Sequence, residues 1–449
     1  MVKYHLKLVD CLGCDFLTSA TIPSMDSFPP ICQVVRILDS SILLIIRSGE
    51  ESQWNLALSQ SLPVLVYLST ILPEASQLGL VTCHLLPSFL SVATYSEVAF
   101  LAALAKFKGP VPRDLSKLQN LRIIDGSENR LGTEEGNDLD FVNSLTNCTH
   151  LQSIYFPFNL LRGPFVRNVA NLSTQIKEIN FRTNQIYGSL PLGIGNLVNL
   201  ETLNMGLNYL TGSLPAHIGK LQRLRRLYFN VNKLSGNIPS SLGNLTLLNY
   251  FSLRENNFSG QIPPELSRCK GLVFLSLSDN NLSGPIPEEL TGLFSLSITL
   301  NLSHNSLTGS LPQGIGKLIN LEVLDVSNNN LSSDIPSSIG NCVKLVYLDL
   351  KGNFFSGELS RSLATVRGLE YIDLSHNNIS GHIPAFLGEL SSATILNLSF
   401  NELSGEVPTN GIFQNATIVS LSGNDNFVEV SQNLVFQNAI MERILLSKS

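Results

Sequence analysis

The stretch Leu248–Leu290, LNYFSLRENNFSGQIPPELSRCKGLVFLSLSDNNLSGPIPEEL, contains one pattern twice. In the first copy two apolar residues, Phe251 and Leu253, alternate with polar ones, and an Asn follows three residues later. The two copies of that Asn, Asn256 and Asn280, are 24 residues apart (280 − 256 = 24). Internal repeats of this period indicate a solenoid, in which each copy completes its core only by stacking on its neighbours.

The same Asn recurs through most of the chain, in steps of 24 or 25 residues after a first step of 30. The twelve copies, here called the Asn ladder, are Asn129, Asn159, Asn184, Asn208, Asn232, Asn256, Asn280, Asn305, Asn329, Asn353, Asn377 and Asn401. The alternating core before each Asn predicts one short strand per copy, with its Leu side chains inward, and parallel stacking of these strands makes a curved sheet. Gly and Pro after the Asn predict an irregular convex side, because Pro prevents a long helix.

Each ladder Asn is predicted to be buried at the turn after its strand. A carboxamide both donates and accepts hydrogen bonds, so it can satisfy backbone groups that a turn would otherwise leave unpaired. Replacing one by Ala is expected to cost roughly 1 to 3 kcal/mol for each buried group left unsatisfied.

The tail of each copy, LSGNIPSSLGNL at Leu234–Leu245, resembles the plant-type leucine-rich repeat. The whole array resembles the ectodomain of a plant leucine-rich-repeat receptor-like serine/threonine kinase. Two irregular segments, GNDLDFVNSLTNCTHL at Gly136–Leu151 and GEVPTNGIFQNATIVSLSGN at Gly405–Asn424, resemble the immune-type subgroup of that family. The resemblance implies an α/β leucine-rich-repeat right-handed superhelix, a solenoid with a parallel β-sheet on the concave face and plant-type repeats of about 24 residues.

Three segments are expected along the chain: a non-repeat extension over 1–85, a leucine-rich-repeat domain over 86–424 and a divergent tail over 425–449. The domain would hold about twelve repeats and one decayed copy, in which Phe107 and Val111 are in register and Ala105 takes the place of the ladder Asn. No clear signal peptide, C-terminal transmembrane helix or kinase motif is found in the sequence. The chain is therefore expected not to be an enzyme and to need no cofactor.

By resemblance, the protein is expected at the plasma membrane or outside the cell, although membrane association is left open. Its expected function is to bind a peptide or protein ligand in plant defence or development signalling, with a receptor-kinase coreceptor as a further partner. Two alternatives are a secreted repeat-type inhibitor or binder and a truncated, non-signalling receptor fragment. The formal net charge of −6 and the absence of a basic face argue against a nucleic-acid partner.

Ten Asn-x-Ser/Thr sequons mark candidate glycosylation sites, although the repeat consensus also generates such triplets for packing reasons. They are Asn147, Asn171, Asn244, Asn257, Asn281, Asn301, Asn330, Asn378, Asn397 and Asn415. Cys148, Cys269 and Cys342 share one phase of the repeat and are too far apart to pair, so they are predicted to be buried fillers. No metal site or catalytic constellation is predicted.

Outward-facing residues between about Gln152 and Asp279 predict a mixed aromatic and basic strip on the concave face, suited to an extended peptide or an acidic protein surface. The candidate ligand-binding residues are Tyr155, Phe158, Arg182, Arg225, Arg226, Tyr228, Tyr250, Arg254 and Phe274. Scattered aromatics on a solvated strand face are the alternative.

Three later repeats place Asp325, Asp349 and Asp373 in one outward column, with their carboxylates about 5 Å apart. We expect these carboxylates to be exposed and solvated. The alternatives are that they bind a cation or that mutual repulsion raises one pKa. By analogy with the family, this acidic part would serve a second contact such as the coreceptor.

Overall fold

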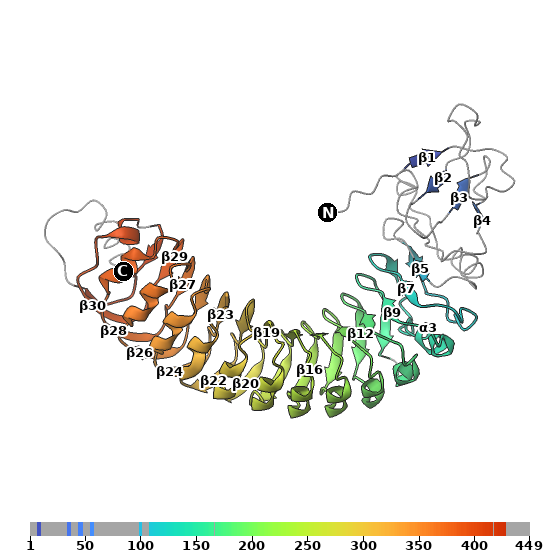
Figure 1. Ribbon diagram of the computed structural model, residues 1–449, viewed down its shortest axis with the longest axis horizontal. Helices are drawn as coiled ribbons and strands as arrows, with labels where there is room; N and C mark the ends of the chain where they lie inside the picture. Colours follow the sequence, from blue (N-terminus) through green and yellow to red (C-terminus); the bar gives the residue numbers. More distant parts are fainter. Residues whose placement is uncertain are drawn as a thin grey trace. The chain divides into compact units, whose positions relative to one another are not determined.

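The computed structural model describes residues 107–165, 167–415 and 417–427, together with the backbone of five short strands that precede them (Figure 1). The chain forms two compact units, Met1–Tyr187 and Gly188–Ser449, called the N-terminal and the C-terminal unit. Most of the predicted 1–85 extension, Ala105 and most of the predicted 425–449 tail lie outside the described residues.

The C-terminal unit is a stack of repeats, each contributing one three-residue strand to the inner side of a curved array (Figure 1). These strands are β13 (Thr202–Asn204), β15 (Arg226–Tyr228), β17 (Tyr250–Ser252), β19 (Phe274–Ser276), β21 (Thr299–Asn301), β23 (Val323–Asp325), β25 (Tyr347–Asp349), β27 (Tyr371–Asp373) and β29 (Ile395–Asn397), followed by the two-residue β31 (Val419–Ser420). Neighbouring strands pair in parallel and in register, as Leu227 with Phe251 and Phe251 with Leu275 show. The parallel concave sheet predicted from the sequence is confirmed.

Each repeat contains a second strand that the sequence analysis did not foresee, so the prediction of one strand per copy is wrong. The second strands form their own parallel array: β14 (Tyr209–Gly212), β16 (Lys233–Asn237), β18 (Asn257–Gly260), β20 (Asn281–Pro285), β22 (Ser306–Gly309), β24 (Asn330–Asp334), β26 (Phe354–Gly357), β28 (Asn378–His382), β30 (Glu402–Gly405) and β32 (Asn426–Phe427). In most repeats the second strand begins directly after the ladder Asn. The residue before the Asn turns the chain between the two strands in a left-handed conformation, with φ of 53° at Glu255 and 55° at Asp279.

The convex side is also more regular than predicted, because a 3₁₀ helix recurs in every repeat of the C-terminal unit. In the C-terminal unit these helices are η7 (Leu192–Asn196), η8 (Ala216–Lys220), η9 (Ser240–Asn244), η10 (Pro264–Arg268), η11 (Glu288–Gly292), η12 (Gln313–Lys317), η13 (Ser337–Asn341), η14 (Arg361–Thr365), η15 (Ala385–Glu389) and η16 (Gly411–Gln414). The consensus Pro lies at the N-cap, as Pro239 does with φ −68° and ψ 132°. Pro therefore marks the start of each helix. Each helix stays short because 3₁₀ helices rarely extend beyond a few residues.

The N-terminal unit contains the first repeats and the long first step. Its strands are β1 (Lys7–Val9), β2 (Val34–Arg36), β3 (Leu44–Arg47), β4 (Trp54–Ala57), β5 (Val98–Phe100), β6 (Lys108–Gly109), β7 (Ile123–Asp125), β8 (Arg130–Leu131), β9 (Ser153–Tyr155), β10 (Arg162–Pro164), β11 (Glu178–Asn180) and β12 (Gln185–Gly188), and its helices are α3 (Phe141–Ser144), η5 (Leu145–Asn147) and η6 (Arg167–Asn171). The decayed copy is paired like the others, since β5 joins β7 in parallel, and its in-register Phe107 and Val111 are buried.

Eleven of the twelve ladder Asn residues are buried as predicted, and Asn305 is half-buried. Asn353 is 5% exposed, and its Nδ2 donates to the carbonyl oxygens of Val326, Leu350 and Lys351 at 3.0, 3.1 and 3.2 Å. Its Oδ1 accepts from the backbone N–H of Leu331 at 3.0 Å. Each such side chain therefore ties its own repeat to the preceding one.

The ladder is longer than the sequence analysis found. Asn424, which is 1% exposed, donates to the carbonyl oxygens of Leu398 and Leu421 and accepts from the N–H of Leu403. The signal was present, because Asn424 follows Asn401 by 23 residues (424 − 401 = 23) and follows an apolar Leu421 by three.

The three cysteines in repeat phase are free thiols buried in the core, as their spacing predicted. Burial raises the pKa of Cys148, Cys269 and Cys342 to about 11. In the described residues, no helix is long and apolar enough to cross a membrane.

Candidate functional site

The concave strands of the C-terminal unit present two parallel rows of outward-facing side chains, because the first and third residues of each strand point away from the core. The first row, called the aromatic row, comprises Arg226, Tyr250, Phe274, Thr299, Val323, Tyr347, Tyr371 and Ile395, which are in register on successive strands. The second, called the polar row, comprises Tyr228, Ser252, Ser276, Asn301, Asp325, Asp349, Asp373 and Asn397.

Aromatic rings stack on neighbouring strands within the aromatic row. The ring centroids of Tyr250 and Phe274 are 6.3 Å apart, and those of Tyr347 and Tyr371 are 4.2 Å apart with an interplanar angle of 6°. All four side chains are half-buried, so part of each remains accessible to solvent. The sequence analysis identified Tyr250 and Phe274 but missed Tyr347 and Tyr371, although all four lie six residues before a ladder Asn.

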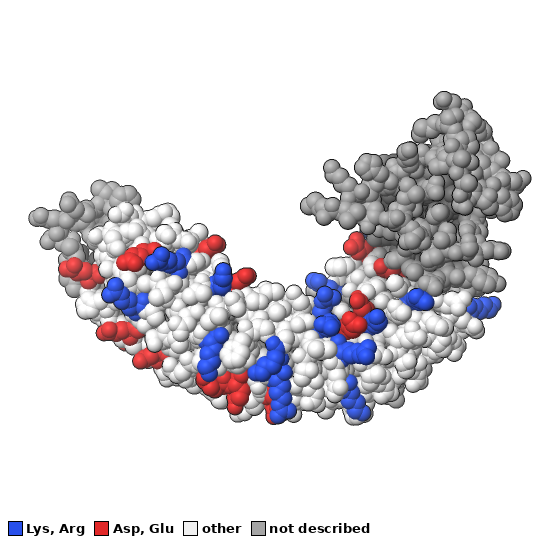
Figure 2. Space-filling model, in the orientation of Figure 1, with Lys and Arg blue, Asp and Glu red and all other residues white. Residues whose placement is uncertain are grey.

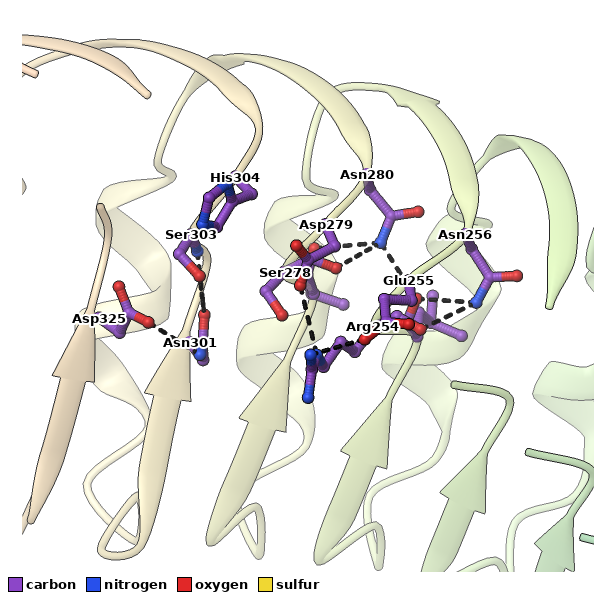
Figure 3. A network of polar contacts seen from close by, with 12 residues as sticks. Arg254, Glu255, Asn256, Ser278, Asp279, Asn280, Asn301, Ser303, His304 and Asp325 are labelled. Atoms are coloured by element: carbon purple, nitrogen blue, oxygen red, sulfur yellow. Dashed lines mark hydrogen bonds and ion pairs between the residues drawn. The ribbon is translucent and has the colours of Figure 1, made fainter. Parts of the chain in front are cut away.

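Two of the arginines predicted near the start of this unit, Arg225 and Arg254, have acidic neighbours. Arg254 contacts Glu255 at 2.6 Å and Asp279 at 3.2 Å, and these three residues meet on adjacent repeats in Figure 3. The Arg225 Nε lies 3.9 Å from an oxygen of Glu201. The surface here is therefore mixed in charge, and Figure 2 shows that most of the visible surface of the described residues carries no charged side chain.

The acidic part of the polar row differs from the expectation of solvated carboxylates. Asp349 and Asp373 are only 8% and 5% exposed, while Asp325 is half-buried. The hydroxyl of Tyr347, from the aromatic row, donates to Asp349 Oδ2 at 3.3 Å. The prediction of solvation was wrong because it ignored the bulky tyrosines two residues earlier on the same strands, which cover the carboxylates.

Burial has an electrostatic consequence at the centre of the column. Desolvation, followed by the charges of Asp325 and Asp373, raises the pKa of Asp349 to about 6. Burial, followed by the charge of Asp349, raises the pKa of Tyr347 as well. The predicted effect of like-charge repulsion is thus present, but removal from water is the larger cause.

Amide side chains lie at both ends of the acidic column, which is formed by Asp325, Asp349 and Asp373. Asn301 Nδ2 donates to Asp325 Oδ2 at 3.0 Å, as Figure 3 shows, and Asn397 Nδ2 donates to Asp373 Oδ2 at 3.1 Å. Among the described residues, no Lys or Arg lies within 4.0 Å of the three carboxylates, and no group of His, Cys, Asp and Glu there has the geometry to hold a metal ion.

In the N-terminal unit the structure brings Phe158 and Arg182 together. The guanidinium carbon of Arg182 lies 5.6 Å from the centroid of the Phe158 ring, which is 46% exposed. Tyr155, on β9, donates a hydrogen bond from its hydroxyl to Glu178 on β11. Burial, followed by this bond, raises the pKa of Tyr155 to about 12. These residues form a second aromatic and polar cluster, within the N-terminal unit.

The ten sequons fall into two groups by the state of the Asn side chain. Eight are exposed: Asn147, Asn171, Asn244, Asn257, Asn281, Asn330, Asn378 and Asn415. The other two, Asn301 and Asn397, are half-buried and use their Nδ2 atoms to hold the acidic column. Since Nδ2 is the atom that carries an N-linked glycan, these two are poor acceptors.

Comparison with known proteins agrees with the repeat geometry. The leucine rich repeat family profiles match residues 199–221, 223–245, 247–269, 271–293, 298–355 and 368–390. The solved HAESA ectodomain of Arabidopsis, in complex with an IDA peptide hormone lengthened at its N-terminus, superposes with a TM-score of 0.64 at 30% identity, over 77% of this chain and 69% of that one. The chain belongs to the leucine-rich-repeat proteins.

Its homologues include plant receptor-like kinases. A putative receptor-like protein kinase of Arabidopsis thaliana is 45% identical over 87 residues, and the rice receptor kinase-like protein Xa21 is 44% identical over 87 residues. Each alignment spans 19% of this leucine-rich-repeat chain and 8% of the relative. The solved TDR receptor superposes with a TM-score of 0.70 at 30% identity, over 77% of this chain and 58% of that one.

Proposed function

We propose that this leucine-rich-repeat protein is a recognition module of a plant cell-surface receptor system, which binds an extended peptide across the concave strands of its C-terminal unit. The observation that carries the proposal is the aromatic row beside the polar row, unbroken from Arg226 to Ile395. Stacked aromatic rings supply contact area, and the adjacent hydroxyl, amide and carboxylate groups supply hydrogen bonds that fix a peptide backbone.

The similar proteins support a peptide as the ligand class. HAESA was solved with the peptide hormone IDA and the co-receptor SERK1, and RGFR1 with RGF2. A parallel sheet holds its side chains in fixed order, so the row can be complementary to a peptide without rearrangement. Signalling in defence or development, with a further receptor kinase as partner, is the corresponding proposal for the biological role.

The test is to select peptides from a displayed random library on the full chain and to measure the selected peptides by calorimetry. We expect the double variant Arg226→Glu with Tyr250→Ala to weaken binding at least about tenfold, as for loss of hot-spot residues. The matched control is Lys233→Glu with Tyr209→Ala, another cation and aromatic pair, 5.6 Å apart and exposed, on the second sheet. The proposal would be contradicted if no peptide were enriched, or if both double variants lost the same affinity for the selected peptides.

Passage through the secretory route is a separate part of the proposal and has its own test. Expression in plant cells followed by glycosidase digestion should produce a mass shift. Peptide mass spectrometry should find glycans on exposed sites such as Asn281 and Asn378 and none on Asn301 and Asn397. An unshifted product would contradict a cell-surface location.

A further inference from the structure

The acidic column of Asp325, Asp349 and Asp373 lies inside the surface proposed for peptide binding. Its strands, β23, β25 and β27, fall between Arg226 and Ile395, which bound the aromatic row. The three residues are in register on adjacent parallel strands, so neighbouring Cα atoms are about 5 Å apart. A peptide on this surface would therefore displace water from a line of like charges.

Asp349, at the centre of the column, is almost fully buried but retains 8% exposure. Each of its oxygens already accepts a hydrogen bond from the protein. Oδ1 accepts from the backbone N–H of Lys351 at 3.0 Å, and Oδ2 accepts from the hydroxyl of Tyr347 at 3.3 Å. A bound peptide is therefore expected to act on Asp349 mainly by excluding the remaining water.

The charge of Asp349 has no cationic partner. The titratable and charged side chains that flank it on β25 and on the two neighbouring strands, with the residues next to each strand, are Glu322, Asp325, Tyr347, Lys351, Glu370, Tyr371, Asp373 and His376. Among the described residues, no Lys or Arg lies within 4.0 Å of the column. In the free protein, desolvation, ahead of the like charges of Asp325 and Asp373, already raises the pKa of Asp349 to about 6.

Removing water disfavours the charged form of a carboxyl group. A peptide that covers β23, β25 and β27 would strengthen the effect that is already largest at Asp349. We propose that peptide binding across these strands takes up a proton at Asp349, so that the protein binds an uncharged peptide more tightly as the pH falls. This inference rests on the proposed function and adds to it a regulation of the same site by pH.

Protons and peptide then bind cooperatively. Because the bound form holds more protons than the free form, each decrease in pH through this range favours the complex. The gain in affinity is complete below about pH 5, where Asp349 is protonated even in the free protein. It is lost as the pH rises through the pKa of the bound form.

Calorimetry on the full chain tests the inference. The ligand is a peptide selected from a displayed library that lacks Asp, Glu, His, Lys and Arg, and it is synthesised with blocked ends so that only the protein titrates in this range. Its affinity should rise at least about threefold between about pH 7.5 and about pH 5. At about pH 6.5, buffers that differ in heat of ionisation should reveal proton uptake on binding.

Asp349→Asn should bind the same peptide with one affinity across the pH range and without proton uptake, because an amide does not titrate there. His376 is retained in this variant, so loss of the pH dependence assigns it to Asp349. The matched control is Ser276→Ala, which changes the same row three strands earlier without removing a carboxyl group. Whatever its affinity, this control should keep the wild-type pH dependence.

A measurement without peptide tests Asp349 by itself. In the free protein, one Asp carboxyl resonance in the ¹³C NMR spectrum should titrate near pH 6 and be missing from Asp349→Asn. The absence of such a resonance would overturn the inference even if peptides bind.

Three further results would overturn the inference and leave the proposed function standing. They are an affinity for uncharged peptides that stays constant or falls in acid, a pH dependence that Asp349→Asn retains, and ligands obtained from the random library but none from the uncharged one. The last result would show that a peptide must bring its own cation to the column. If neither library yielded a ligand, the proposed function would be contradicted, and this inference with it.

Discussion

Two parts of the same concave sheet have the same backbone arrangement but differ in how their charged side chains are paired and buried. Directly after β17 and β19 the charged groups are paired, as the exposed Arg254 is with the half-buried Glu255 and Asp279. On β23, β25 and β27 three carboxylates are aligned without a cationic partner among the described residues, and two of them are buried under tyrosines. The strand register is the same in both parts. The fold therefore accommodates charged groups whose burial costs different amounts of free energy, because the core and the Asn ladder supply the stability.

The largest expected effect tests the claim of a common scaffold. Asn256 and Asn353, one in each part, make the same set of hydrogen bonds to their own and the preceding repeat. Replacing either by Ala should reduce the free energy of unfolding by about 3 kcal/mol, because several buried backbone groups lose their partner. Urea unfolding followed by circular dichroism measures both variants. Costs that differ several-fold would show that the two parts do not share one source of stability.

A smaller effect is expected from removing the buried charge. Because the pKa of Asp349 is raised to about 6 in the folded protein, above its ordinary value of 3.8, protonation stabilises the fold. That contribution is complete below about pH 4 and is lost as the pH rises through about 6. Asp349→Asn should therefore be more stable than the wild type at pH 7.5, by on the order of 1 kcal/mol after solvent screening.

The pH profile provides the stricter measurement for Asp349. Between pH 4 and 7 the wild type should lose stability relative to Asp349→Asn. Parallel profiles for the two proteins would show that Asp349 is not desolvated as described.

The smallest effect is expected at the exposed ion pairs. Arg254→Ala should change the free energy of unfolding by less than about 1 kcal/mol, because solvent screens a surface pair and holding its side chains costs entropy. The change should shrink further in 1 M NaCl. A salt-independent loss of several kcal/mol would instead indicate that Arg254 stabilises the fold by packing.

The sequence was sufficient to predict the features that depend on the period of the repeat and on a residue's position within it. The repeat spacing located the concave strands, the inward Leu residues and the function of the Asn ladder, because each of these follows from one residue's position in its own copy. The second strand was missed because its short x-Leu-x-Gly pattern overlaps the segment interpreted as a convex turn. The 3₁₀ helices were missed because Pro was considered only as a residue that ends helices.

The candidate site was predictable only in part, since its properties arise between repeats. Reading along the strand identified Tyr250 and Phe274, but the stacking of Tyr347 on Tyr371 needs the register of two strands 24 residues apart. The burial of Asp349 depends on Tyr347, and the pairing of Arg254 depends on Asp279 in the next copy. The ring stacking and the pairing of Arg254 each join two copies, whereas the contact of Tyr347 with Asp349 lies within one strand and could have been predicted from the sequence.

The Asn ladder also constrains how such a gene can change length. Asn353 reaches back 27 residues to Val326 and 22 residues to Leu331, and the other ladder residues in the C-terminal unit keep nearly the same intervals. Recombination that inserts or deletes one whole copy supplies an equivalent carbonyl and N–H at both positions. A shift of a few residues breaks the bonds on both sides of the junction. Leucine-rich-repeat proteins with this ladder can thus gain or lose entire repeats, with a new set of outward side chains each time, whereas a partial repeat would disrupt the ladder.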